Sequence, residues 1–128
     1  MEKCQLKGMY PVFAQEFPKK EISIETLDDL CQYFNEQIEK HPVAKYICTF
    51  DHYEHTTALE DAEIEKTIIG AKIILLCFGK KLLDPKILSV RPRAIGLCET
   101  KSHFVISLLE PPNPVMTETM INWVRDLT

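Results

Sequence analysis

Residues 93–110, RAIGLCETKSHFVISLLE, contain two apolar segments separated by a short polar one. The alternation of apolar and polar residues predicts two strands, 93–99 and 103–110, joined by a turn. If Lys101 and Ser102 form the turn, Leu97 lies opposite Ile106. Such apolar cross-strand pairs stabilise a sheet. This stretch therefore predicts an antiparallel hairpin.

Three segments upstream carry further strand signals. Residues 11–17 alternate apolar and polar, and Pro18 ends the segment because proline lacks the N–H that a strand ladder needs. Residues 71–78, AKIILLCF, form an almost unbroken apolar run, which is typical of a strand covered on both faces or lying inside a sheet. In residues 43–52 apolar and polar residues also alternate, which predicts a further strand. Four of their side chains are predicted to face the core: Ala44, Tyr46, Cys48 and Phe50.

Two segments have the three- and four-residue apolar spacing of amphipathic helices. The first begins at Ser23 or Thr26, and the side chain of Thr26 with Asp29 resembles a capping box. This helix ends at His41, because Pro42 disfavours a helical residue before it. The second follows Asn113, a good N-cap with a proline after it, and runs toward the end of the chain.

The element order is thus β-α-β-β-β-β-α. Four consecutive strands after the first helix favour an α+β fold: a mainly antiparallel sheet of about five strands, with two main helices on one face. A doubly wound parallel sheet is the alternative, but it needs more crossover helices than the sequence offers. At 128 residues, the chain is predicted to form a single domain over residues 1–128.

Composition excludes several classes of protein. The formal net charge of −4 argues against a nucleic-acid-binding module, which normally has a basic face. No apolar run approaches the roughly 20 residues that cross a bilayer, and the first residues do not resemble a signal peptide. The five cysteines have no CxxC spacing, so a thiolate zinc site is not indicated, and Cys48 and Cys77 are interpreted as small core residues. A cytoplasmic location is expected.

Titratable side chains cluster at the end of the second strand, in Asp51, His52, Tyr53, Glu54 and His55. If the strand continues, His52 and His55 face opposite sides. If the chain turns helically, the two imidazoles become neighbours and could bind Zn²⁺ or Fe²⁺ together with Asp51. The alternatives are a strand end whose histidines make ordinary hydrogen bonds, and an acid–base or ligand site in which Glu54 orients a histidine.

A second cluster is basic and comprises Lys80, Lys81, Arg91 and Arg93. The arginine guanidinium is a planar fork that matches the oxygens of a carboxylate or phosphate. Arg91 and Arg93 are two residues apart, so in a strand their side chains would point to the same side and could bind one anion. The plainer interpretation is a cross-strand ion pair between Arg93 and Glu110, which lie opposite one another in the hairpin register.

Four segments, HPVAKYICTFDHYEHT, LCFGKKL, SVRPRAIG and FVISLLEPPNP, resemble a small family of uncharacterised bacterial proteins. The resemblance extends over nearly the whole chain. Its distinctive segments are DHY-x-H, here residues 51–55, and RPR, here residues 91–93. The resemblance implies a single-domain, bacterial, cytosolic protein, and it brings no assigned activity or catalytic residue.

These observations support three hypotheses about function. The first is a module that binds a small anionic ligand where the two clusters converge. Its contacts would come from both clusters: His52, Tyr53, His55, Arg91 and Arg93. The second is a metal-dependent enzyme with a divalent cation held by Asp51, His52 and His55. The third is a homodimer formed through an open sheet edge or through the Met- and Trp-containing last helix.

Overall fold

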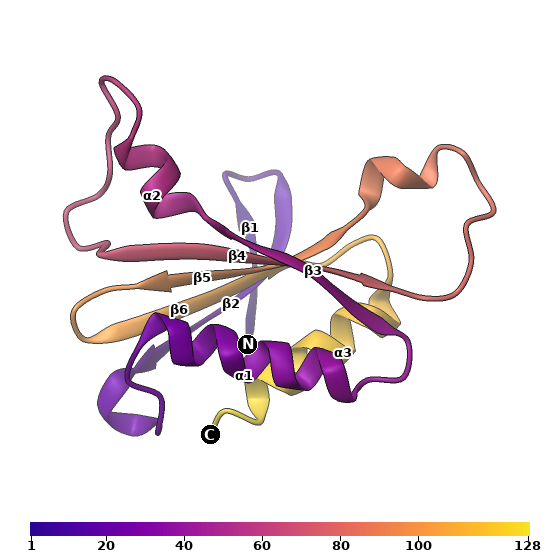
Figure 1. Ribbon diagram of the computed structural model, residues 1–128, viewed down its shortest axis with the longest axis horizontal. Helices are drawn as coiled ribbons and strands as arrows, with labels where there is room; N and C mark the ends of the chain where they lie inside the picture. Colours follow the sequence, from indigo (N-terminus) through magenta and orange to yellow (C-terminus); the bar gives the residue numbers. More distant parts are fainter.

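The computed structural model describes residues 1–128 and contains one six-stranded antiparallel sheet, in the order β1-β2-β6-β5-β4-β3. The elements follow one another along the chain as β1 (Glu2–Leu6), β2 (Tyr10–Pro18), η1 (Lys19–Glu21), α1 (Leu27–Lys40), β3 (Ala44–Asp51), α2 (His52–Thr57), β4 (Gly70–Phe78), η2 (Ile87–Val90), β5 (Arg93–Glu99), β6 (His103–Leu109) and α3 (Pro114–Arg125). Helices α1 and α3 lie side by side on one face of the sheet (Figure 1). The α+β class and the antiparallel sheet are confirmed.

The two main helices begin where their caps predict. Thr26 accepts a hydrogen bond from the backbone N–H of Asp29 at 3.0 Å, and α1 ends before Pro42. Asn113 accepts from the backbone N–H groups of Val115 and Met116, and Pro114 is the first residue of α3. These side chains satisfy amide donors that have no partner inside a helix.

The core lies between the helices and one face of the sheet. Strand β4 contributes the fully buried Ile74 and Leu76, and the hairpin contributes Leu97 opposite Ile106, as predicted. The helices supply their apolar stripes, among them Phe34, which is fully buried. Together 18 buried apolar residues form one continuous cluster.

The sheet has six strands where about five were predicted, and a short third helix is present besides the two main helices. Strand β1 pairs with β2 through a turn in which Lys7 has a φ of 53° and Gly8 a φ of 69°. All five residues of β1 are exposed, so the sequence has no apolar alternation to mark it. The third helix, α2, starts directly after β3, at His52, so the helical alternative for the residues after the strand is the correct one.

The prediction that Ala44, Tyr46, Cys48 and Phe50 share a face is also wrong. Ala44 and Tyr46 pair with Phe78 and Leu76, whose side chains face the helices. A β-bulge follows Tyr46, and beyond it Cys48 and Phe50 pair with Leu75 and Ile73 on the opposite face. A bulge inserts one residue and so reverses the alternation of the strand. Cys48 is consequently exposed and is not a core residue.

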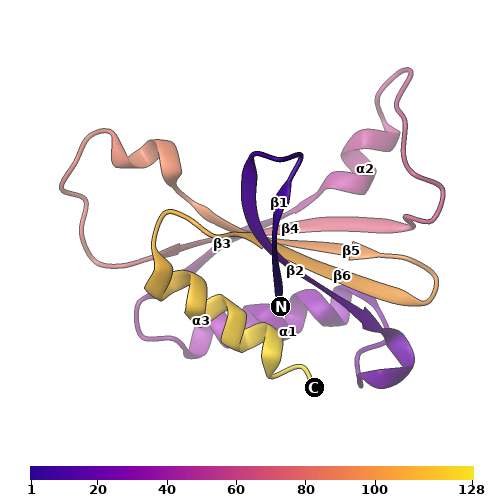
Figure 2. The same ribbon diagram turned by 180° about the vertical axis from the view of Figure 1, so that it is seen from behind.

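The other face of the sheet has no covering helix layer. Ile73, Leu75 and Cys77 of β4 point to this side and are only half-buried, whereas their neighbours Ile74 and Leu76 are fully buried. Strand β4 is therefore an interior strand covered on one face only. We call this side the open face. The β1–β2 hairpin and the η2 segment project on this side (Figures 1 and 2).

Candidate functional site

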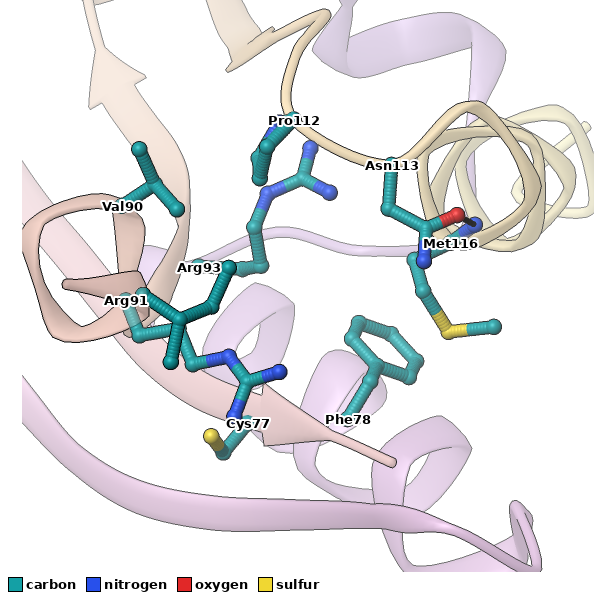
Figure 3. A pocket seen from close by; sticks show the side chains of 9 residues that line it. Cys77, Phe78, Val90, Arg91, Arg93, Pro112, Asn113 and Met116 are labelled. Carbon is teal, nitrogen blue, oxygen red and sulfur yellow. Dashed lines mark hydrogen bonds between the residues drawn. The ribbon is translucent and has the colours of Figure 1, made fainter. Parts of the chain in front are cut away.

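A small pocket of about 160 Å³ lies where the end of β4, the start of β5 and the N-terminus of α3 meet (Figure 3). Nine residues line it, among them Arg91, Arg93, Pro112 and Asn113, and we call it the arginine pocket. None of the nine is an aspartate or a glutamate. The pocket therefore combines two guanidinium groups with no acidic partner.

Arg93 is the first residue of β5, and its side chain is carried to the helix-covered side of the sheet. The residue is only 8% exposed. Its Nη2 donates to the carbonyl oxygen of Leu109 and to the hydroxyl oxygen of Thr117, both at 2.8 Å. Its Nη1 is buried and has no hydrogen-bond partner. One arm of a buried guanidinium is thus left without an acceptor.

The predicted ion pair between Arg93 and Glu110 is wrong. Glu110 instead pairs with Lys3, with 2.6 Å between Nζ and Oε2. Lys3 belongs to β1, the strand that the sequence did not reveal. With its expected partner engaged elsewhere, Arg93 forms no salt bridge.

Burial lowers the pKa of the Arg93 guanidinium, because removal from water disfavours its charged form. The group nevertheless stays charged at neutral pH, since arginine is not deprotonated in proteins. A buried charge without a counter-charge costs several kcal/mol. The arginine pocket is therefore a place of positive potential that an anion would stabilise.

Arg91 and Asn113 complete the polar lining. Arg91 follows η2, is half-buried, and donates through Nη1 to the carbonyl oxygen of Lys81 at 3.1 Å. Asn113 is the N-cap of α3, a helix of 12 residues whose N-terminal end carries a partial positive charge. Lys80 and Lys81 are exposed on the preceding loop and do not line the pocket.

At the other candidate site, the helical alternative for residues 51–55 is the one that the structure contains. Asp51 is the N-cap of α2 and accepts from the backbone N–H of Glu54 at 2.9 Å. The imidazoles of His52 and His55 are neighbours, with ring centroids 6.0 Å apart, and both lie against the ring of Phe50. Both histidines are exposed.

These residues do not form a set of metal ligands. No group of three or more His, Cys, Asp or Glu side chains has the arrangement that a metal ion requires. The carboxylate of Asp51 is already engaged in capping α2, and His52 Nδ1 lies 2.9 Å from the hydroxyl of Thr56. Tyr53 lines a separate shallow cleft with Asp28. The cluster thus supplies two imidazoles without a third ligand.

The histidines and the arginines lie at opposite ends of the sheet. Asp51 pairs with Lys72, which pairs with Leu97 on β5. Arg93 precedes Leu97 by four residues, which corresponds to about 13 Å along β5. In addition, β3 is separated from β5 by two strand spacings of about 5 Å each. The convergence that the first hypothesis required does not occur, and no small ligand can contact both groups.

Comparison with known proteins gives one match. The model of a family of unknown function, DUF6858, matches residues 1–128. The chain belongs to this family. No curated protein and no solved structure matches it. None of its helices has the length and hydrophobicity needed to cross a membrane.

In this DUF6858 chain, the sequence pointed to the two arginines of the pocket but not to Asn113 as a lining residue or to Thr117 as a hydrogen-bond partner of Arg93. Asn113 was identified only as a helix cap, and Thr117 was not singled out. Their positions beside Arg93 depend on where α3 packs on the sheet. The Pro-Pro-Asn-Pro segment, residues 111–114, was the available signal, because it fixes the start of α3 directly after β6.

Proposed function

We propose that the protein binds a small anion, an oxyanion or a carboxylate, in the arginine pocket. The observation that carries the proposal is the buried Arg93, which lines a pocket without acidic residues and whose Nη1 has no acceptor. An anion there would accept from Nη1 and would neutralise a charge that the fold leaves uncompensated. The histidine cluster has no part in this site.

Two further features support an anionic ligand. Arg91 can turn a second guanidinium toward the same pocket, which permits recognition of an oxyanion from two sides. The N-terminus of α3 adds its partial positive charge. The volume of about 160 Å³ suits a small head group rather than a whole drug-sized molecule.

Calorimetric titration with acetate, sulfate and phosphate tests the proposal. The unmodified protein is expected to bind at least one of these anions at one per chain. Arg91→Gln removes a partly exposed guanidinium, so the fold is expected to survive, and affinity should fall about tenfold, the equivalent of one weak charge-assisted hydrogen bond.

Lys101→Gln is the matched control. Lys101 is exposed in the loop at the opposite end of β5, so its substitution changes the net charge equally without touching the pocket. Equal weakening by both substitutions would indicate general charge attraction and would refute the site. Absence of binding by all three anions would refute the proposed function itself.

A further inference from the structure

A second hollow adjoins the arginine pocket on the open face. This apolar cleft has a volume of about 590 Å³, within the usual range of roughly 300–1,000 Å³ for sites that hold organic ligands. Its floor is formed by residues of three neighbouring strands, including Ile73, Ala94 and Ser107. Leu6 and Val12 of the β1–β2 hairpin line it from one side, and the segment after η2 lines it from the other.

The cleft and the arginine pocket share four residues: Val90, Arg91, Arg93 and Pro112. The two hollows are therefore neighbours, and they adjoin where β5 begins. Like the arginine pocket, the cleft has no aspartate or glutamate in its lining. Positive charge is concentrated at the end of the cleft that adjoins the arginine pocket, and apolar surface extends away from that end.

Several apolar side chains of the cleft are exposed to water. Leu6 is 53% exposed, Leu109 is 44% exposed and Val90 is 42% exposed, and all three line the cleft. Contiguous apolar surface of this kind marks a place where something binds. The charge at one end distinguishes among the candidates, because it selects a ligand with a negative head.

We infer that the ligand is an amphipathic carboxylate, whose head group lies at Arg91 and Arg93 and whose hydrocarbon chain lies in the apolar cleft. This inference rests on the proposed function and adds the class of ligand to it. The carboxylate accepts from the half-buried Arg91, which lines both hollows, and lies beside the uncompensated charge of Arg93, while the chain covers the floor around Ala94. Burial of each methylene group then adds to the affinity.

The test is a calorimetric series of acetate, butyrate, hexanoate and octanoate, with octanol as the uncharged ligand of equal length. Full burial of a methylene corresponds to about a fourfold gain in affinity. Because the cleft is open on one side, about a twofold gain per methylene is expected, so octanoate should bind at least tenfold tighter than acetate. Octanol should bind more weakly than octanoate.

Two variants locate the chain. Ala94→Phe fills the floor of the cleft and should remove the gain in affinity with chain length. Ala71→Phe is the control, since it places the same side chain on the same face of the sheet but outside the cleft. Circular dichroism on both variants verifies that they fold.

Alkylation of cysteines with iodoacetamide provides an independent test of whether the ligand occupies the cleft. Cys4 lines the cleft, whereas Cys48 is exposed on the edge strand away from it. Octanoate should slow modification of Cys4 and leave that of Cys48 unchanged.

The outcomes separate this inference from the proposed function. Small anions that bind, with no gain from acetate to octanoate, overturn the inference and leave the proposed function standing. Octanol binding as tightly as octanoate overturns the role of the arginines. Protection of Cys4 in a ligand-free dimer, seen by sedimentation, also overturns the inference, because a second copy of the chain would then cover the cleft. If no anion binds at all, both fail.

Discussion

Replacement of Arg93 by methionine tests the energetic basis of the arginine pocket. Methionine is apolar and unbranched, so it fits a long buried site without a charge. The substitution removes the two hydrogen bonds from Nη2, each worth about 1.5–3 kcal/mol to a charged donor. It also removes the several kcal/mol that the uncompensated charge costs. The two effects oppose one another, so the free energy of unfolding without ligand should change by no more than about 2 kcal/mol.

The response to an anion should differ far more. A ligand at a hundred times its Kd stabilises the native state by about 2.7 kcal/mol. For a chain of this length that corresponds to a rise in Tm of about 10 °C. Arg93→Met should lose this rise. Sulfate also stabilises proteins generally by exclusion from their surface, so the measured quantity is the difference between wild type and variant in the same salt.

The assay is thermal unfolding by circular dichroism in chloride and in sulfate, phosphate or acetate at equal ionic strength. An equal rise in Tm for both proteins would refute the reasoning. A decrease of more than about 4 kcal/mol in the free energy of unfolding of the ligand-free variant would also refute it. A decrease that large is typical of breaking a buried charge pair that was already compensated.

Two further predictions concern the helix-covered side of the sheet. Burial, and secondarily the carboxylate of Asp126, raises the pKa of Tyr33 to about 12 from 10.0. The folded state therefore favours the neutral phenol, so stability from Tyr33 is intact below pH 10.0 and is lost as the pH rises toward about 12. An ultraviolet titration of Tyr33→Phe should lack the last tyrosinate step, and an unchanged titration would contradict this. Phe34→Ala should destabilise the fold by about 3–5 kcal/mol in urea unfolding, because Phe34 is fully buried. Phe50→Ala is the control and should cost much less, because Phe50 is 39% exposed. Equal losses of stability in the two variants would contradict the assignment of the core.

The sequence predicted those elements whose signals are local. Both main helices have capping side chains and apolar stripes, and the β5–β6 hairpin has an apolar cross-strand pair. Strand β1 could not be predicted in the same way, because it is a fully exposed edge strand. The bulge in β3 also has no local signature, and one inserted residue was enough to move Cys48 and Phe50 to the open face.

The candidate site was predicted in part. Arg91 and Arg93 were grouped correctly because they are two residues apart. Their isolation from acids could not be predicted, because it depends on Lys3 engaging Glu110 from a strand far away in sequence. For the histidines a signal was available: Asp51 followed three residues later by Glu54 is a capping pattern, which favours a helix at His52. The distance between the two clusters depended on strand order, which no local pattern encodes.

The bulge in β3 has a second effect, on how the protein meets its neighbours. Strand β3 is an edge of the sheet, and an edge with unpaired N–H and C=O groups is a template on which another chain can add a strand. A bulge breaks the regular spacing of those groups, and the exposed Lys45 places a charge beside it. The irregularity that moves Phe50 to the open face therefore also guards this edge against strand-to-strand aggregation.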